Sequence, residues 1–122
     1  MIGYVTVGTN NLPRAVAFYD ALLGAIGAQR FMTTERFVAW AVGPDKPGFS
    51  VARPWDGQPA TVGNGVMMAF AVPKPEQVDA LHAQALALGA SDEGAPGPRL
   101  PGFYVGYFRD LDGNKLNFFC RT

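Results

Sequence analysis

The chain has little cysteine, no excess of either charge and no long hydrophobic run, and each shortage excludes a structural feature or a class of partner. Cys120 is the only cysteine, so an intramolecular disulfide is impossible, which fits a reducing cytoplasm. Ten Lys and Arg balance ten Asp and Glu, so no basic stripe is available to neutralise nucleic-acid phosphates. No apolar stretch approaches the roughly 20 residues that span a bilayer, and no charged leader precedes an apolar run at the N-terminus. We therefore expect a cytoplasmic protein with neither a nucleic-acid nor a membrane partner.

The residues that are abundant are apolar. They make up 48% of 122 residues, enough to bury a full core in one domain. We expect a single domain over residues 1–122, with a first half at about 1–53, a connector at about 54–65 and a second half at about 66–122.

The first half shows a strand, a helix and three further strands. Residues 1–8 are rich in Val, Ile, Tyr and Thr, as short strands are. Asn10 and Asn11 offer an N-cap, Pro13 suits a first turn and Gly27 suits a stop, which predicts a helix over about 11–26. Strand-like runs follow near 28–33, 35–42 and 48–53.

The second half repeats this order. It has a strand at 66–72 and a helix that opens at Pro75 and closes at Gly89. Pro13 and Pro75 lie 62 positions apart, as do Gly27 and Gly89. A period this close to half the chain indicates an internal duplication.

Residues 91–102 are rich in Gly and Pro and are predicted to form a long loop of the kind that lids and rims use. The segments 103–109 and 115–120 flank the turn-forming run 110–114, which predicts a closing hairpin.

Each half therefore has the order βαβββ, and the fold class is α+β. Strands at hairpin distance favour antiparallel pairing, and one helix covers the outer face of each sheet. Two such modules are expected to form a curved mixed or antiparallel sheet around a cleft, with the helices outside.

A doubled βαβββ chain of this length resembles the vicinal oxygen chelate superfamily, which includes glyoxalase I, bleomycin resistance proteins and extradiol dioxygenases. Leu12, Phe18-Tyr19 and Leu23-Gly24 look like the first helix of that family, and the run from Arg109 to Asn114 looks like its last hairpin. The likeness covers essentially the whole chain.

In metal-using members, the resemblance implies two His on the opening strands and acidic residues on the closing strands, all around one divalent ion. The corresponding positions here are Tyr4, Met67 and Asn117, with the fourth near Ser50 or Ala52. Phenol, thioether and amide groups are poor ligands for Zn, Mn, Ni or Fe(II), which prefer imidazole and carboxylate. We therefore predict no catalytic divalent metal and no cofactor.

Other chemically suggestive residues have simpler interpretations. His82 is predicted to lie on the outer surface of the second helix, away from any cleft. The run 110–114 departs from a calcium loop in its early Gly and in Arg121, and it is better interpreted as a structural turn. Cys120 is interpreted as a small apolar residue of the last strand.

Strand alternation predicts which side chains line the cleft. Tyr107 should lie opposite Asn117 on the same face. The predicted ligand-binding residues are Tyr4, Thr6, Met67, Tyr107, Lys115, Asn117 and Phe119. The alternative is that Tyr4, Met67 and Phe119 fill the space and leave no cavity.

These residues leave three functions open. The first is a metal-free protein that binds a small, partly aromatic molecule, as the drug-sequestering branch of the superfamily does. The second is a glyoxalase-like or dioxygenase-like enzyme in which Lys115, Tyr4 or Tyr107 supplies the proton chemistry. The third is a structural or partner-binding module. The resemblance also implies a homodimer.

Overall fold

The computed structural model describes all residues, 1–122, and divides the chain into two compact units, residues 1–62 and 63–122. No helix in the structure is both long and apolar enough to span a membrane.

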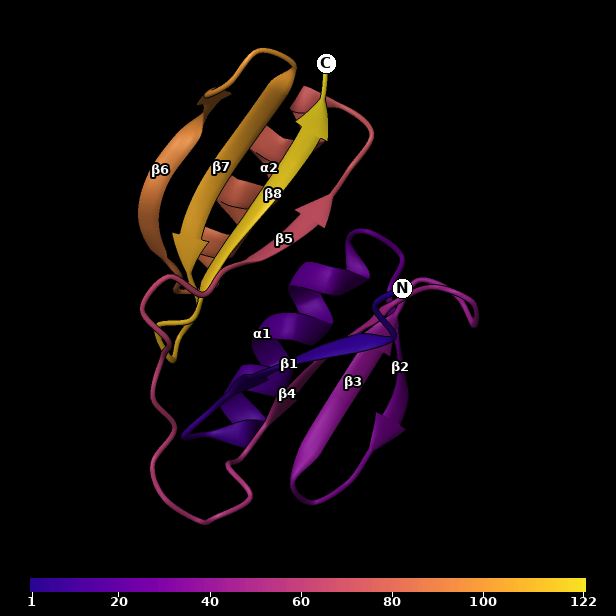
Figure 1. Ribbon diagram of the computed structural model, residues 1–122, viewed down its shortest axis with the longest axis vertical. Coiled ribbons are helices and arrows are strands. Elements are labelled where there is room, and N and C mark those ends of the chain that lie inside the picture. Colours follow the sequence, from indigo (N-terminus) through magenta and orange to yellow (C-terminus); the bar gives the residue numbers. More distant parts are fainter. The chain divides into compact units, whose positions relative to one another are not determined.

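The first unit is a four-stranded sheet with one helix (Figure 1). Its elements in chain order are β1 (Tyr4–Gly8), α1 (Leu12–Gly24), β2 (Gln29–Thr33), β3 (Phe37–Ala41) and β4 (Gly48–Ala52). The strands are ordered β1-β4-β3-β2 across the sheet. β1 runs parallel to β4, and the other two pairs are antiparallel.

The core of the first unit lies between α1 and the sheet. The side chain of Asn11 caps the helix by accepting a hydrogen bond from the Arg14 N–H at 3.1 Å. The helix then buries one face, on which Tyr19 is fully buried. The centre of the Tyr19 ring lies 5.8 Å from that of Trp40 and 4.8 Å from that of Phe49. This packing fixes which face of the sheet α1 covers, so the other face is left open.

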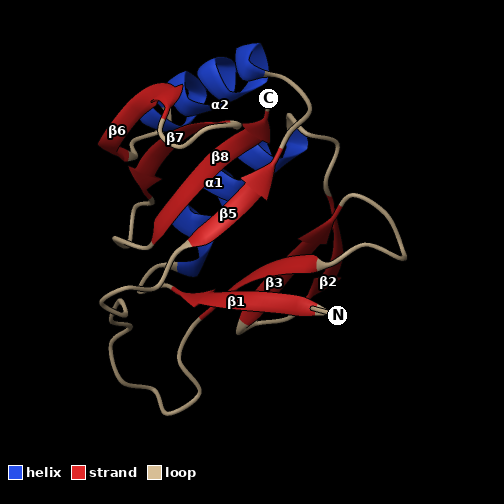
Figure 2. Cartoon of the chain, turned by 45° about the horizontal axis from the view of Figure 1, so that its top comes forward, coloured by secondary structure: helices blue, strands red, loops and turns tan.

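The second unit repeats this arrangement, and α2 crosses one face of its sheet (Figure 2). Its elements are β5 (Met68–Ala71), α2 (Pro75–Ala87), β6 (Ser91–Pro98), β7 (Phe103–Arg109) and β8 (Lys115–Arg121). The strand order is β5-β8-β7-β6, in which β5 is parallel to β8 and the remaining pairs are antiparallel.

The predicted α+β class and the βαβββ order of each half are confirmed. Antiparallel pairing from hairpin distance holds for the last three strands of each unit only. Each opening strand instead pairs with the last strand of its unit, which follows a helix and two other strands along the chain, and this pair is parallel.

The prediction of a long loop over residues 91–102 was wrong, because residues 91–98 form β6. β6 is an edge strand with two register shifts against β7, near Gly94 and Gly97. Gly and Pro are tolerated at an edge because bulges absorb the extra residues and one side of the strand needs no partner.

The prediction that His82 faces outward was also wrong. His82 is 5% exposed and lies on the buried side of α2. Its Nε2 is 3.0 Å from the carbonyl oxygen of Tyr107 and 3.2 Å from Oδ1 of Asp92. His82 follows Val78 by four residues and precedes Ala85 by three, so it belongs to the buried stripe of the helix.

The turn after β7 is held by its own residues. Oδ1 of Asp110 accepts hydrogen bonds from the N–H groups of Asp112 and Asn114, both at 2.9 Å, and Oδ2 accepts one from Nδ2 of Asn114. The carboxylate thus supports a structural turn, as predicted. Cys120 is buried on β8 as a free thiol, which confirms its interpretation as a core residue.

Candidate ligand-binding site

The open face of the first sheet, defined as the face that α1 does not cover, holds a cavity of about 250 Å³. Its floor is made of small side chains in register, since Ser50 of β4 pairs with Thr6 of β1 and with Ala39 of β3. The walls are large and apolar. They are formed by Tyr4, Phe31, Met32 and Phe37. The contrast between small floor residues and large wall residues is what creates the space.

A hydroxyl pair lies on this floor. Oγ of Ser50 donates a hydrogen bond to the carbonyl oxygen of Val5 at 3.0 Å, and it lies 2.6 Å from Oγ1 of Thr6. A carbonyl oxygen only accepts, so the single hydroxyl hydrogen of Ser50 is used there. The short contact between the two hydroxyls is then a hydrogen bond from Thr6 to Ser50.

Arg36 is the only charged residue that lines this cavity. Its guanidinium carbon lies 5.7 Å from the ring centre of Phe37 and 5.1 Å from that of Trp55, and its Nη1 donates to the carbonyl oxygen of Arg53 at 3.0 Å. It forms no ion pair with a carboxylate. The cavity therefore joins an apolar body to one positive edge.

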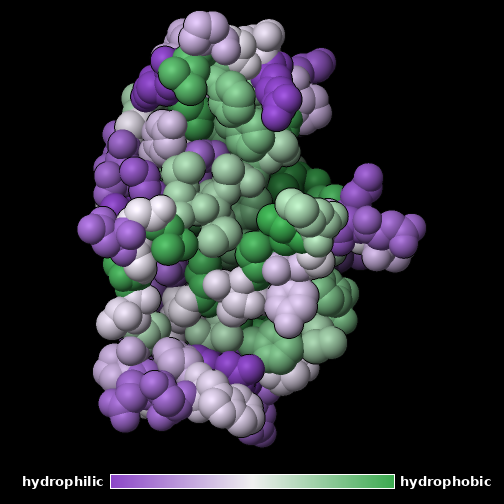
Figure 3. Space-filling view, viewed as in Figure 1, coloured by the Kyte–Doolittle hydropathy of each residue, from purple (hydrophilic) through white to green (hydrophobic).

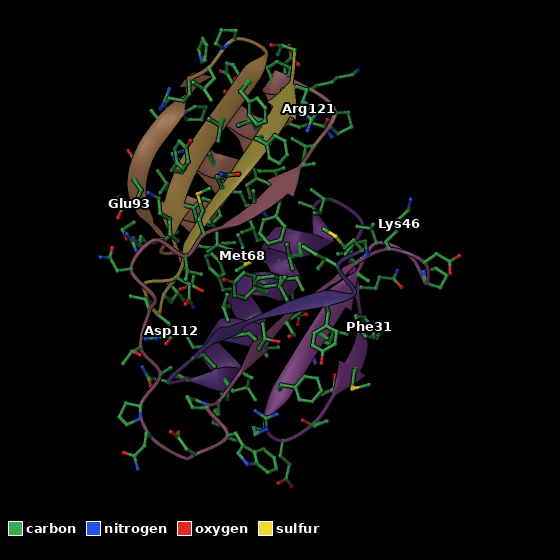
Figure 4. All side chains as sticks on the ribbon, in the orientation of Figure 1. Phe31, Lys46, Met68, Glu93, Asp112 and Arg121 are labelled. Atoms are coloured by element: carbon green, nitrogen blue, oxygen red, sulfur yellow. The ribbon has the colours of Figure 1, made fainter.

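Phe31 extends from the edge strand β2 (Figure 4) and also borders a second, shallower groove of about 750 Å³. Exposed loop residues such as Pro44 and Lys46 form much of that groove. The smaller cavity is the better candidate site because its floor is rigid sheet and its polar groups converge.

The open face of the second sheet carries the remaining predicted site residues. Nδ2 of Asn117 donates to the sulfur of Met67 at 3.4 Å, while Oδ1 of Asn117 is buried with no hydrogen-bond partner. Tyr107 pairs with Asn117 across the β7–β8 ladder, as predicted. Nζ of Lys115 lies 5.4 Å from the centre of the Tyr107 ring.

Phe119 is stacked on Phe103, with ring centres 5.2 Å apart and planes 12° apart. The structure thus groups Met67, Tyr107, Lys115 and Asn117 through these contacts on the second unit, and it places Tyr4 and Thr6 at the cavity of the first.

The register also identifies the fourth position of the metal set that the resemblance implies. Thr6 pairs with Ser50 in the first unit as Ala69 pairs with Asn117 in the second, so Ser50 is the equivalent of Asn117. The four donors are then a phenol, a hydroxyl, a thioether and an amide.

These donors do not fit a divalent ion of the family's kind. The Ser50 hydroxyl is engaged with a backbone carbonyl, and the Asn117 amide turns its N–H toward Met67. Neither residue supplies the imidazole or carboxylate that Zn, Mn, Ni or Fe(II) prefers. No group of three or more His, Cys, Asp and Glu residues with metal-binding geometry occurs elsewhere in the chain.

Of the residues that line the cavity, sequence reasoning did not name Phe31, Met32, Arg36, Phe37 and Ala39 as site residues, and it named Ser50 and Ala52 only as possible metal-ligand positions. The signal for Phe37 was present, because Phe37 and Ala39 alternate with the buried Val38 and Trp40 along β3. No sequence signal marked Arg36, which lies in the turn before β3 and reaches the cavity only through the fold.

Comparison with known proteins is consistent with this architecture. The family model described as Glyoxalase/Bleomycin resistance protein/Dioxygenase superfamily matches residues 1–118. A glyoxalase/bleomycin resistance protein from Albidiferax ferrireducens T118 is 39% identical, with a TM-score of 0.91, over 100% of this chain and 99% of the other.

More distant structures share the fold. An enzyme of the glyoxalase/bleomycin resistance protein/dioxygenase family from Burkholderia phytofirmans PsJN is 19% identical with a TM-score of 0.79, over 98% of both chains. A lactoylglutathione lyase from Agrobacterium tumefaciens is also 19% identical, with a TM-score of 0.74, over 98% of this chain and 92% of the other. The search of curated proteins found no match.

Proposed function

The chain belongs to the Glyoxalase/Bleomycin resistance protein/Dioxygenase superfamily, and from this premise we propose that it binds a small, partly aromatic organic molecule without a catalytic divalent metal. The observation that carries the proposal is an aromatic-walled cavity of about 250 Å³ together with neutral side chains at Tyr4, Ser50, Met67 and Asn117. An apolar space with a few polar groups is the usual make-up of a small-molecule site. The proposed ligand contacts are Tyr4 and Thr6 at this cavity. On the open face of the second sheet, taken by itself, the proposed contacts are Met67, Tyr107, Lys115, Asn117 and Phe119.

A thermal-shift screen tests ligand binding. A compound that binds only the native state raises the unfolding temperature, and saturation at 100 times Kd adds about 2.7 kcal/mol to the free energy of unfolding. We expect stabilisation by aromatic compounds of one ring. A broad panel in which no compound stabilises the protein at millimolar concentration would contradict the proposal.

Elemental analysis tests the metal part of the proposal. Protein purified without a His-tag and dialysed against metal-free buffer is expected to contain well under one equivalent of Zn, Mn, Ni or Fe. A stoichiometric divalent ion that resists dialysis would overturn this part while leaving ligand binding intact.

The second candidate is an enzyme, and Lys115 is the observation that favours it. Its ammonium group lies over the Tyr107 ring and forms no ion pair, so its charge is available to contact a substrate. Assays for lactoylglutathione formation and for extradiol ring cleavage, with and without added metals, test this candidate. We expect no turnover, since no activated nucleophile or acid–base pair accompanies Lys115.

We further propose that both units act as one domain and that the chain forms a homodimer in the cytoplasm. Hydrophobic residues occupy part of the visible surface (Figure 3), and Ile2, Phe31, Met32 and Val42 of the first unit are among those exposed. Such apolar surface is typical of protein interfaces. Light scattering is expected to give twice 13.0 kDa, and a monomer mass would contradict the dimer.

A further inference from the structure

We propose that the ligand of the first-sheet cavity is a hydroxylated aromatic carboxylic acid, whose hydroxyl donates to Oγ1 of Thr6 and whose carboxylate pairs with Arg36. This inference rests on the proposed binding function and specifies its ligand class. It follows from counting hydrogens and charges at the cavity.

The hydrogen count makes Thr6 an acceptor. The Ser50 hydrogen goes to the carbonyl oxygen of Val5, and the Thr6 hydrogen goes to Oγ of Ser50. Both hydroxyl hydrogens therefore point into the sheet. Oγ1 of Thr6, which lines the cavity, offers only lone pairs to a ligand.

A ligand oxygen that lacks a hydrogen would meet these lone pairs with repulsion. A ligand hydroxyl would instead complete a relay from the ligand to Thr6, to Ser50 and to the backbone. Ser50, 2% exposed, is fixed by the strand pairing on both sides, so the relay is held in place. The floor thus selects a protonated hydroxyl, the opposite of what a chelated metal ion selects.

The charge count points to an anion. Arg36 lines the cavity, no Asp or Glu does, and Arg36 forms no ion pair. Its Nη1 bond to the backbone and its stacking beside Phe37 and Trp55 hold the guanidinium at the edge of the cavity. A planar guanidinium with free N–H groups matches a carboxylate in geometry as well as in charge.

The space between these groups suits one aromatic ring. An apolar cavity of about 150 Å³ holds benzene, and this cavity measures about 250 Å³. Tyr4, Phe31 and Phe37 supply ring surfaces around it. A single ring that carries a hydroxyl and a carboxylate can contact Thr6 on the floor, Arg36 at the edge and the aromatic walls at the same time.

Calorimetric titration with matched probes tests the inference. The probes are the three positional isomers of hydroxybenzoate, the methylbenzoates, in which a methyl group of similar size replaces the hydroxyl, and the neutral hydroxybenzamides. The best hydroxybenzoate is expected to bind about three- to tenfold more tightly than its methyl counterpart. It should also bind about tenfold more tightly than its amide counterpart, because only the carboxylate pairs with Arg36.

Variants assign each preference to its residue. Thr6→Val removes the acceptor and is expected to reverse the hydroxyl-over-methyl preference, whereas Thr6→Ser keeps the hydroxyl and should keep the preference. Arg36→Gln is expected to lower hydroxybenzoate affinity about tenfold while leaving hydroxybenzamide affinity unchanged. Lys46→Gln, a charge-matched change outside the cavity, should alter neither, and unfolding temperatures establish that each variant is folded.

The outcomes separate this inference from the proposed function. Equal affinity for hydroxybenzoate and methylbenzoate, or a preference that survives in Thr6→Val, overturns the inference while binding itself stands. If neutral aromatic compounds bind but no hydroxybenzoate does, the inference is likewise overturned while the proposed function stands. If no aromatic compound binds at all, the inference and the proposed function fail together.

Discussion

Asn117 carries an unsatisfied acceptor in the second unit. Its Oδ1 is buried without a partner, and its Nδ2 has only a thioether to bond at 3.4 Å. A buried polar atom without a partner costs about 1–3 kcal/mol. We expect Asn117→Leu, which keeps the branching and the number of heavy atoms of the side chain but removes its polar atoms, to raise the free energy of unfolding by about 1 kcal/mol in urea denaturation.

Asn114 provides the matched control for this prediction. Its amide Nδ2 donates to Oδ2 of Asp110 at 2.9 Å, so Asn114→Leu removes a satisfied bond and is expected to cost about 1–3 kcal/mol. If both changes destabilise the protein equally, the Asn117 acceptor has a partner in solution and the argument for its cost fails.

Asp20 links α1 to the sheet and gives stability a dependence on acid pH. Hydrogen bonding from Arg30 lowers the pKa of the Asp20 carboxyl, whereas burial raises it. The hydrogen bond from Nε1 of Trp40, at 2.9 Å, lowers the pKa further. A lowered pKa means that the stabilisation is present above the ordinary pKa of the carboxyl, 3.8, and is lost as pH falls through the lowered value.

The test compares the protein with Asp20→Asn, which keeps an acceptor for Trp40 but removes the charge. The wild type is expected to unfold at a higher temperature than the variant at neutral pH. The difference should shrink as the pH falls below about 4, and it should be lost as the pH falls through the lowered pKa of Asp20. A difference that is constant over this range would assign the effect to packing instead of charge.

The helices were predictable because their ends carry local signals. Asn11 and Pro13 mark the start of α1, and the repeat then identifies α2 from Pro75. β6 was not predictable from its composition, because Gly and Pro there serve an edge strand with bulges, and only pairing with β7 makes it a strand. Local propensity cannot report a partner that lies far along the chain.

The candidate site was predictable only where strand alternation, a local pattern, determines the side of the sheet on which a residue lies. Alternation placed Tyr4 and Thr6 on one face, and the structure puts both at the cavity. Arg36 could not be predicted, since its position depends on how the turn between β2 and β3 folds. The position of His82 was mispredicted because adjacency to Leu81 does not decide its side of the helix, whereas its spacing of four residues from Val78 places it on the buried stripe.

β6, β7 and α2 approach closely at Gly106. A methyl group there would lie 2.9 Å from Cγ of Pro96 and 3.1 Å from Cδ2 of His82. We expect Gly106→Ala to lower the free energy of unfolding by about 1–3 kcal/mol, because ring atoms of two elements would have to shift.

Gly24 is the control for this substitution. It lies at the end of α1 with nothing within 4 Å of an added methyl group. Gly24→Ala is expected to leave stability unchanged or to raise it by up to about 1 kcal/mol. Chemical denaturation of both variants gives their free energies of unfolding. Equal changes in the two variants would show that the approach at Gly106 is not tight.

The two units share one architecture but carry different residues at equivalent positions. Thr6 and Ser50 form a hydroxyl pair in the first unit, where Ala69 and Asn117 stand in the second. The scaffold is the same in both units, while the polar groups on the two open faces differ. Scaffold and recognition are therefore separable in this chain.

Charge balance governs how the chain behaves in concentrated solution. Equal numbers of acidic and basic residues and a pI near 6.5 leave little net repulsion near neutral pH. We expect the lowest solubility near this pH. Lys46→Glu should move the minimum to lower pH, as measured by light scattering across a pH series, and an unmoved minimum would point to apolar association instead.

The burial of Cys120 makes its thiol a natural probe of unfolding. The thiol is 1% exposed on β8, and no other cysteine competes for a reagent. A disulfide dye such as Ellman's reagent should react only when β8 detaches from the core, so the rate of colour development reports how readily the second sheet opens. Ligands that stabilise the second sheet can then be ranked by how far they slow that colour, without an added label.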